Sequence, residues 1–155
     1  MKALTHSIFA FIFCVVIYHI CVPYVAANRS LVLVSGTVAL VLGPLPDLDA
    51  HGSLKFIGHR SGFSHSIFTV VLLSGLAYVL FSNYPPLDLI IIPAVIGAIT
   101  SHILLDALTV SGCPLFWPFT RHRFSARLCK YDNPLVNAAI IVLSFFAILV
   151  FVLYS

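Results

Sequence analysis

Histidine and aspartate residues gather in a few stretches of a chain that is otherwise almost free of charge. Only 5 acidic and 8 basic residues occur among 155, and the mean hydropathy is +1.10. Two stretches stand out, "GPLPDLDAHGSLKFIGHRSGFSHS" at 43–66 and "SHILLDALT" at 101–109. In the second, His102 and Asp106 are four positions apart and would share one face of a helix. Imidazole and carboxylate groups are the usual ligands of zinc and similar ions, which predicts a metal site.

The predicted ligands come from four separate parts of the chain, and each lies near the same end of an apolar segment. Ionisable groups in membrane segments are costly and usually face the interior of a bundle. A bound cation would offset the repulsion between clustered carboxylates. The candidate metal ligands are His6, Asp47, Asp49, His59, His65, His102 and Asp106. Which Asp and which His bind directly is left open.

Each candidate also has an ordinary structural interpretation. His6 alone would suit an interfacial hydrogen bond, and His102 with Asp106 would suit a hydrogen bond that fixes a helix. Asp47 and Asp49 follow two prolines and would suit a turn and a helix cap. Their joint placement at one membrane face is what favours metal binding.

Five apolar segments approach the length needed to cross about 30 Å of hydrocarbon. They are predicted at 4–27, 31–46, 64–83, 88–109 and 135–154, and the second is the shortest. Only 8% of residues are charged, against about 25% in soluble domains. These features predict an all-α, polytopic membrane helix bundle with a single domain, residues 1–155. The first segment exceeds a usual signal core and is expected to be a retained span.

The basic residues predict the orientation of the bundle. If all five segments cross, only Arg29 lies on one side, and positive residues favour the cytoplasmic side. The N-terminus, both long loops and the metal site are therefore expected at the cytoplasmic face of the inner membrane. The residues on that side are Lys2, Lys55, Arg60, Arg121, Arg123, Arg127 and Lys130.

Several classes of site are excluded by missing motifs. The sequence has no Glu, so it holds no H-E-x-x-H metalloprotease motif. No G-x-S-x-G elbow supports a serine nucleophile, and Ser64 and Ser66, which flank His65, are instead expected to orient it. The four cysteines form no disulfide framework. Those at 14 and 21 are expected to pack in the interior, and those at 113 and 129 are too far apart for a C-x-x-C pair.

Other notable side chains are expected to serve structure or membrane contact. His19 lies thirteen positions after His6, roughly 20 Å along a helix, so it is expected to pack or to lie near the far interface. His122 belongs to a basic loop that would meet anionic headgroups. Trp117 fits an interfacial aromatic belt. His51 remains undecided.

The ordered motifs "PDLD", "HRSGFSHS", "HILLDALTVSG" and "WPF" resemble the YdjM-like family of membrane-bound metal-dependent hydrolases. That family is also described as LexA-binding, inner-membrane-associated hydrolases. The resemblance extends from "THS" at 5–7 to "WPF" at 117–119. It implies a class of reaction but does not identify the substrate. A LexA-type partner cannot be read from the sequence.

A more distant similarity is to the zinc-dependent phospholipase C and P1 nuclease group, which uses an H-x-x-x-D pair on a helix. That resemblance implies that His102 and Asp106 are this pair, with Asp106 able to bridge two metals. It implies earlier ligands among His6, one of Asp47 and Asp49, and one of His59 and His65. The group's later H-x-x-x-E pair has no counterpart here, so one or two ions are implied, with zinc foremost.

The expected function is metal-assisted hydrolysis of a phosphoester, lipid or lipid-linked, at the cytoplasmic face. Bound metal would lower the pKa of a water toward about 7. Asp47 or Asp49, whichever is not a ligand, would act as general base or orient a histidine. Arg60 would clamp a phosphate or simply set the topology.

Two other classes of function remain as alternatives. A metal or proton carrier would need polar residues through the membrane, and the third and fifth segments are essentially apolar at mid-span. A metal-containing binding or regulatory protein would use the same ligands as a hydrolase. Membrane lipids are the expected partners, met by the loop at 113–131. No nucleic acid is expected, and a protein partner is unknown.

Overall fold

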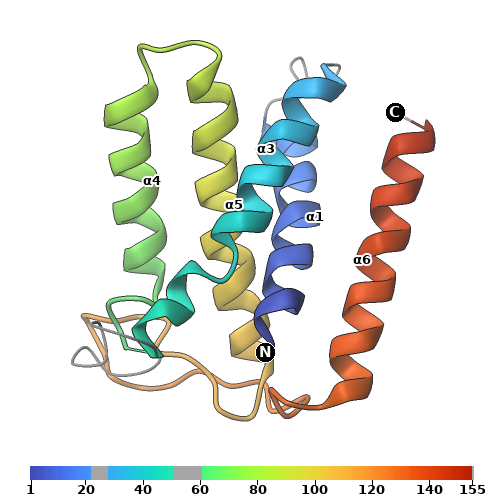
Figure 1. The fold of residues 1–155 in the computed structure, drawn as a ribbon. Helices are drawn as coiled ribbons and strands as arrows, with labels where there is room; N and C mark the ends of the chain where they lie inside the picture. Colours follow the sequence, from blue (N-terminus) through green and yellow to red (C-terminus); the bar gives the residue numbers. More distant parts are fainter. Residues whose placement is uncertain (22–27, 51–60, 155) are drawn as a thin grey trace.

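The chain forms a bundle of roughly upright helices. The computed structural model describes residues 1–21, 28–50 and 61–154. The helices are α1 (Ala3–Cys21), α3 (Arg29–Leu42), α4 (Ile67–Phe81), α5 (Leu87–Leu108) and α6 (Pro134–Tyr154), with a short 3-10 helix η1 (Leu45–Ala50) (Figure 1). Within these ranges no strand is present. The all-α prediction is confirmed, and each predicted apolar segment overlaps one α-helix.

Four stretches are long and apolar enough to cross a membrane: Ala3–Ile20, Arg29–Leu48, Leu87–Leu108 and Pro134–Leu153. The second joins α3 to η1. Helix α4 is shorter, at 15 residues, or about 22 Å. The predicted segment at 64–83 is longer than α4 because it also includes the capping residues at both ends of the helix. The Ser66 side chain accepts a hydrogen bond from the Thr69 N–H, and Ser82 is the C-cap.

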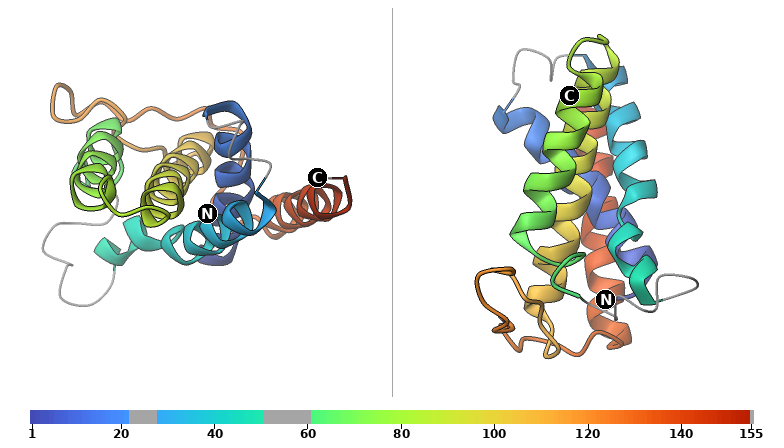
Figure 2. Two further views of the ribbon diagram at one scale, coloured as in Figure 1. Left: turned by 90° about the horizontal axis from the view of Figure 1, so that it is seen from above. Right: turned by 90° about the vertical axis from the view of Figure 1, so that its left-hand side faces the viewer.

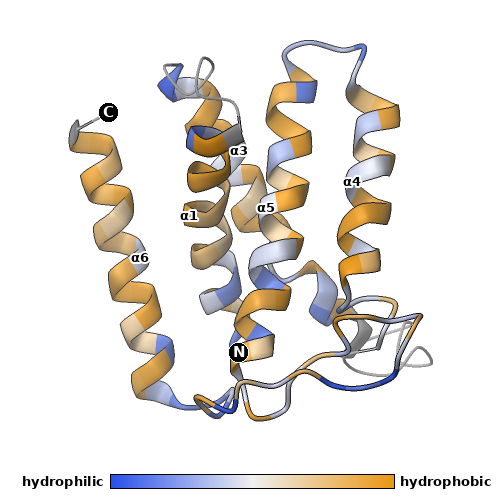
Figure 3. Cartoon of the chain, turned by 180° about the vertical axis from the view of Figure 1, so that it is seen from behind, coloured by the Kyte–Doolittle hydropathy of each residue, from blue (hydrophilic) through white to orange (hydrophobic). Residues whose placement is uncertain are grey.

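Helices α1, α3 and α5 pack against one another, α4 packs on α5, and α6 packs on α1 (Figure 2). Small residues permit the close crossings, as is common between membrane helices. A Cβ added at Gly97 would lie 3.0 Å from the Cα of Cys14, and one at Gly36 would meet the Phe11 ring. Most residues of the helices are hydrophobic (Figure 3), and many large hydrophobic side chains are exposed, as a lipid environment permits.

The N-terminus, η1 and the loop between α5 and α6 lie at one end of the bundle (Figure 1). The 82–86 turn and the C-terminus lie at the other. This arrangement agrees with the predicted alternation of the segments. Which end faces the cytoplasm remains a prediction.

The loop at 109–133 folds back on the end of α5. The Ala126 N–H donates to the Ala107 carbonyl at 2.8 Å, and the Leu128 N–H donates to the Leu108 carbonyl at 3.0 Å. A third bond, from the Ile67 N–H to the Leu115 carbonyl at 3.0 Å, ties the loop to the start of α4. The loop therefore has a defined position beside the residues that precede α4.

Asn137 joins α6 to the start of α1. Its Oδ1 accepts hydrogen bonds from the Thr5 hydroxyl at 2.7 Å and from the Lys2 N–H at 3.2 Å, while its Nδ2 donates to the Tyr131 and Asn133 carbonyls. The residue is buried. No motif indicated this contact in the sequence.

Candidate metal centre

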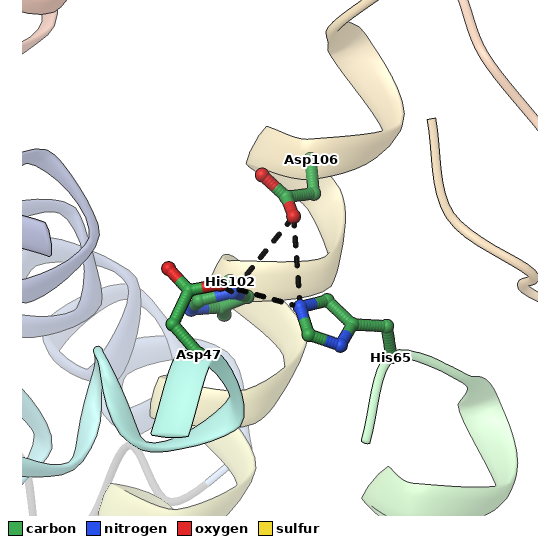
Figure 4. A group of neighbouring side chains, drawn as sticks. All are labelled: Asp47, His65, His102 and Asp106. Carbon is green, nitrogen blue, oxygen red and sulfur yellow. Dashed lines mark ion pairs between the residues drawn. The ribbon is translucent and has the colours of Figure 1, made fainter. Parts of the chain in front are cut away.

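Four of the predicted ligands converge where η1, the turn before α4 and the end of α5 meet (Figure 4). Asp47 comes from η1, His65 from the turn before α4, and His102 and Asp106 from α5. One potential ligand atom of each residue lies within 4.8 Å of those of the other three. Four residues far apart in sequence thus form a cluster that could bind a metal ion.

The distances within the cluster suit a small cation. His65 Nε2 lies 3.6 Å from Asp47 Oδ1 and 3.6 Å from Asp106 Oδ2. His102 Nε2 lies 3.5 Å and 3.9 Å from the same two oxygens. Ligands bound at about 2.0–2.1 Å to a tetrahedral ion are separated by about 3.4 Å. The cluster is therefore close to the size that a tetrahedral site requires.

The orientation of His102 also calls for a cation. Its Nδ1 lies 2.7 Å from the carbonyl oxygen of Gly43, and because a carbonyl only accepts, Nδ1 must carry the proton. In a neutral ring Nε2 then presents a lone pair. This buried atom has no hydrogen-bond partner among the described residues, and it faces two carboxylates. A metal ion, or a second proton, is needed between them.

Gly43 can reach His102 because α3 approaches α1 closely at this point. A Cβ at position 43 would lie 2.9 Å from the carbonyl oxygen of His6 and 3.0 Å from the Cα of Ser7. Both are backbone atoms, which cannot move aside without shifting a helix. Glycine is therefore needed here to bring its carbonyl to the imidazole.

The other histidine is oriented by a neighbouring hydroxyl. Ser64 Oγ lies 2.7 Å from His65 Nδ1, which leaves Nε2 directed toward the carboxylates. The expected orienting role of Ser64 therefore has a matching contact. Ser66 instead caps α4, as described above.

Replacing Ser64 with Ala is expected to weaken metal binding by about 10- to 100-fold, because groups that orient metal-binding histidines contribute effects of this size. Competition with a chromophoric chelator would measure the affinity. Ser66→Ala is the comparison: its loss of a cap should cost about 1 kcal/mol of stability and leave the affinity nearly unchanged. Equal affinities in wild type and Ser64→Ala would contradict the orienting role.

His6 lies beside the cluster, on the other side of Asp106. Its ring stacks on that of His102, with centroids 3.7 Å apart and planes 14° apart. Its Nε2 lies 3.5 Å from Asp106 Oδ1, and the Met1 nitrogen lies 2.9 Å from the same oxygen. Asp106 thus turns Oδ2 toward the four-residue cluster and Oδ1 toward His6 and Met1.

Three side chains of the cluster are fully buried and the fourth is partly exposed. The side chains of His65, His102 and Asp106 are each 0% exposed, whereas Asp47 is 22% exposed. Asp47 is therefore the most accessible of the four residues.

Some of the predicted site residues cannot be placed. His59, Arg60 and His51 lie outside the described residues, as does the side chain of Asp49. Their predicted roles stay predictions.

The residues that were expected to pack or to lie at the surface are found in the following positions. The His19 ring contacts Phe151 edge-on, at 5.6 Å between centroids, so it packs far from the cluster. His122 is exposed in the loop after α5. Cys14 is buried and lies 3.3 Å from the Ser35 hydroxyl. Three cysteines, Cys14, Cys113 and Cys129, are free thiols.

Comparison with known proteins identifies the family. The whole chain, residues 1–155, matches the family described as YdjM inner membrane protein. The chain belongs to this family. Membership agrees with the four apolar helices of membrane-spanning length and with the expected inner-membrane localisation. No curated protein and no solved structure matches the chain. The similarity to the phospholipase C and P1 nuclease group therefore remains a prediction.

Proposed function

We propose that this YdjM family member is a membrane-embedded, metal-dependent hydrolase. In this proposal His65, His102 and Asp106 hold one divalent ion, and Asp47 lies beside it as the general base. The observation that carries the proposal is the convergence of four ligand atoms within 4.8 Å, including a histidine nitrogen whose lone pair faces two carboxylates.

Zinc suits this set of ligands best. Two imidazoles with carboxylate oxygens are a common donor set for zinc, whereas magnesium and calcium prefer oxygen ligands alone. No thiolate lies in the cluster, which disfavours the softer metals. A single ion is proposed because Asp106 Oδ1, the oxygen that would bridge to a second ion, already faces the Met1 nitrogen at 2.9 Å.

Hydrolysis is supported by the unequal burial of the four residues. Catalytic zinc sites usually have three protein ligands and one open position. Three residues of this cluster are fully buried, and the fourth, Asp47, is at the exposed edge. A bound divalent ion would supply activation of water and polarisation of the ester oxygen. The Asp47 carboxylate would accept a proton from the attacking water.

A metal-containing regulatory protein is the second candidate. Four ligand atoms at near-tetrahedral spacing are also what a closed structural site needs, and Asp47 would then be the fourth ligand. A metal carrier is less well supported. The described residues contain only this one group of three or more His, Cys, Asp or Glu at metal-binding distances, and it lies at one end of the bundle.

The reaction is tested by loading the purified protein with zinc and assaying it against phosphomonoesters, phosphodiesters and short-chain phospholipids. Zinc-dependent release of product from one of these classes is the expected result, with activity abolished by a chelator and restored by zinc. A zinc-loaded, folded protein that hydrolyses none of the three classes would refute the phosphoester assignment.

A further inference from the structure

A cavity lies next to the metal cluster. It measures about 460 Å³ and lies between the turn before α4 and the loop after α5, and this volume is typical of small-molecule sites. Its lining includes Ser61, Gly62, Phe63, Trp117, Arg121 and Arg123. None of these residues belongs to the four-residue cluster.

The aromatic wall of this cavity is fixed in place. The Trp117 ring meets Phe63 and Phe68 edge-on, with centroids 6.3 Å and 5.6 Å away. A Cβ added at Gly62 would overlap the Trp117 ring. Position 62 must therefore be glycine for the indole to occupy this position.

The cavity is also positively charged. Arg121 and Arg123 both line it, and Arg123 Nη2 donates to the Gly112 carbonyl at 3.2 Å. Within the described parts of the chain, neither arginine forms an ion pair with an acidic side chain. Guanidinium groups bind phosphate in a bidentate manner, and two of them facing one cavity favour an anionic phosphate ligand.

A short chain of hydrogen bonds links the cavity to the metal cluster. Ser61, in the cavity wall, has its Oγ 2.9 Å from that of Ser64, and Ser64 Oγ lies 2.7 Å from His65 Nδ1. The His65 N–H also donates to the Ser61 carbonyl at 3.0 Å. One turn of chain thus forms the wall of the cavity and supplies a ligand of the cluster.

An apolar groove is lined by residues close in sequence to two members of the cluster. It has a volume of about 220 Å³ and is lined by residues of α3, η1, α4 and α5; in Figure 1, α5 lies between α4 and α3. Leu45 in its lining is two residues before Asp47, and Ile99 is three residues before His102. The cationic cavity and a groove suited to an acyl chain are thus both lined by residues close in sequence to members of the cluster.

We propose that the cavity formed by Trp117, Arg121 and Arg123 binds the phosphate headgroup of an anionic phospholipid. This assignment deepens the proposed function by naming the substrate class, and it rests on that function only for the reaction that follows binding. The groove gives a reason to favour a lipid over free phosphate, since the acyl chain would lie along α4 while the phosphate meets the arginines.

Trp117 is the only tryptophan of the chain, so its fluorescence reports directly on this cavity. Metal-free protein in an uncharged detergent would be titrated with short-chain phosphatidic acid, short-chain phosphatidylcholine and inorganic phosphate. A chelator keeps the cluster inactive, which separates binding from hydrolysis. Saturable binding of phosphatidic acid, tighter than that of either other probe, is the expected result.

Two variants and one control sharpen the test. The double variant Arg121→Gln/Arg123→Gln should bind phosphatidic acid about tenfold more weakly or worse, since each lost charged hydrogen bond has an effect of this size. Gly62→Ala should also weaken binding, with no change in charge. Arg127→Gln/Lys130→Gln removes the same charge from the same loop outside the cavity, and should bind as wild type does.

Three outcomes would overturn the assignment. Equal weakening in both double variants would mean that phosphatidic acid is held by general charge. Inorganic phosphate binding as tightly as the lipid would assign the cavity to free phosphate, and no saturable response to any probe would remove the site. Because binding is measured without metal, a failure here leaves the hydrolase proposal standing, and a cluster that binds no metal leaves this one standing.

Discussion

Replacing Asp106 with Asn is expected to weaken zinc binding by more than about 100-fold. Removing a partner that merely orients a ligand already costs 10- to 100-fold, and Oδ2 of Asp106, the proposed ligand oxygen, faces both His65 and His102. An amide has nearly the same shape as a carboxylate, but it carries no charge to offset that of the cation. Competition with a chromophoric chelator would measure the affinity of both proteins.

Asp88→Asn is the matched control for this variant. Asp88 lies in the first turn of α5 and Asp106 in its last turns, so they are at opposite ends of the bundle. The same chemical change there should leave zinc affinity unaltered. Circular dichroism would verify that both variants keep their helix content. If Asp106→Asn bound zinc as tightly as Asp88→Asn, Asp106 would not be a ligand.

Replacing Asp47 with Asn is expected to separate the two candidate functions. Asn cannot accept a proton from water, and loss of a general base usually slows a reaction by about 10²- to 10⁴-fold. With His65, His102 and Asp106 intact, the zinc content should remain close to one ion per chain. Steady-state hydrolysis and metal content, measured on the same preparation, would test both statements.

The regulatory alternative predicts the opposite pattern for this variant. If Asp47 is the fourth ligand of a closed site, Asp47→Asn should lose most of its zinc. A variant that keeps both zinc and full activity would exclude Asp47 from either role. Asp88→Asn again serves as the control, since Asp88 lies at the other end of α5, where its carboxylate accepts a hydrogen bond from the Leu89 N–H at 2.8 Å.

The membrane depth of the site could be predicted from the sequence, whereas its detailed geometry could not. Consecutive spans cross the membrane in opposite directions, so the order of the segments predicts at which end of the bundle each one terminates. This rule brings Asp47, His65 and the end of α5 to one end. The i, i+4 spacing of His102 and Asp106 fixes their relation to each other. These two rules included all four residues of the cluster among seven candidates, but they left open which Asp and which His would bind directly.

The predicted position of a span does not determine how its helix is rotated about its own axis. It also does not determine the path of the turns between helices. The Gly43 carbonyl that orients His102 belongs to the turn after α3, and the Ser64 hydroxyl belongs to the turn before α4. Such turns have no repeating pattern that would indicate their contacts. For the same reason, the cavity beside Trp117 could not be predicted, although its tryptophan and the basic loop were expected to lie at the membrane surface.

The contact made by Asn137 illustrates another limit. A single amide in an apolar segment usually indicates little, and here it accepts hydrogen bonds from the start of α1. Its importance depends on how α6 packs against α1, which only the folded structure reveals. The length of α4 was overestimated for a related reason, because a polar cap next to an apolar run extends the apparent segment.

The central claim is that the cluster holds one divalent ion, and metal content tests it most directly. The protein would be purified in detergent without chelator and analysed by inductively coupled plasma mass spectrometry, before and after zinc is supplied. One zinc ion per folded chain is the predicted result. A folded protein that holds no transition metal even after zinc is supplied would contradict the account, and the histidines and aspartates would then form a polar network without a metal.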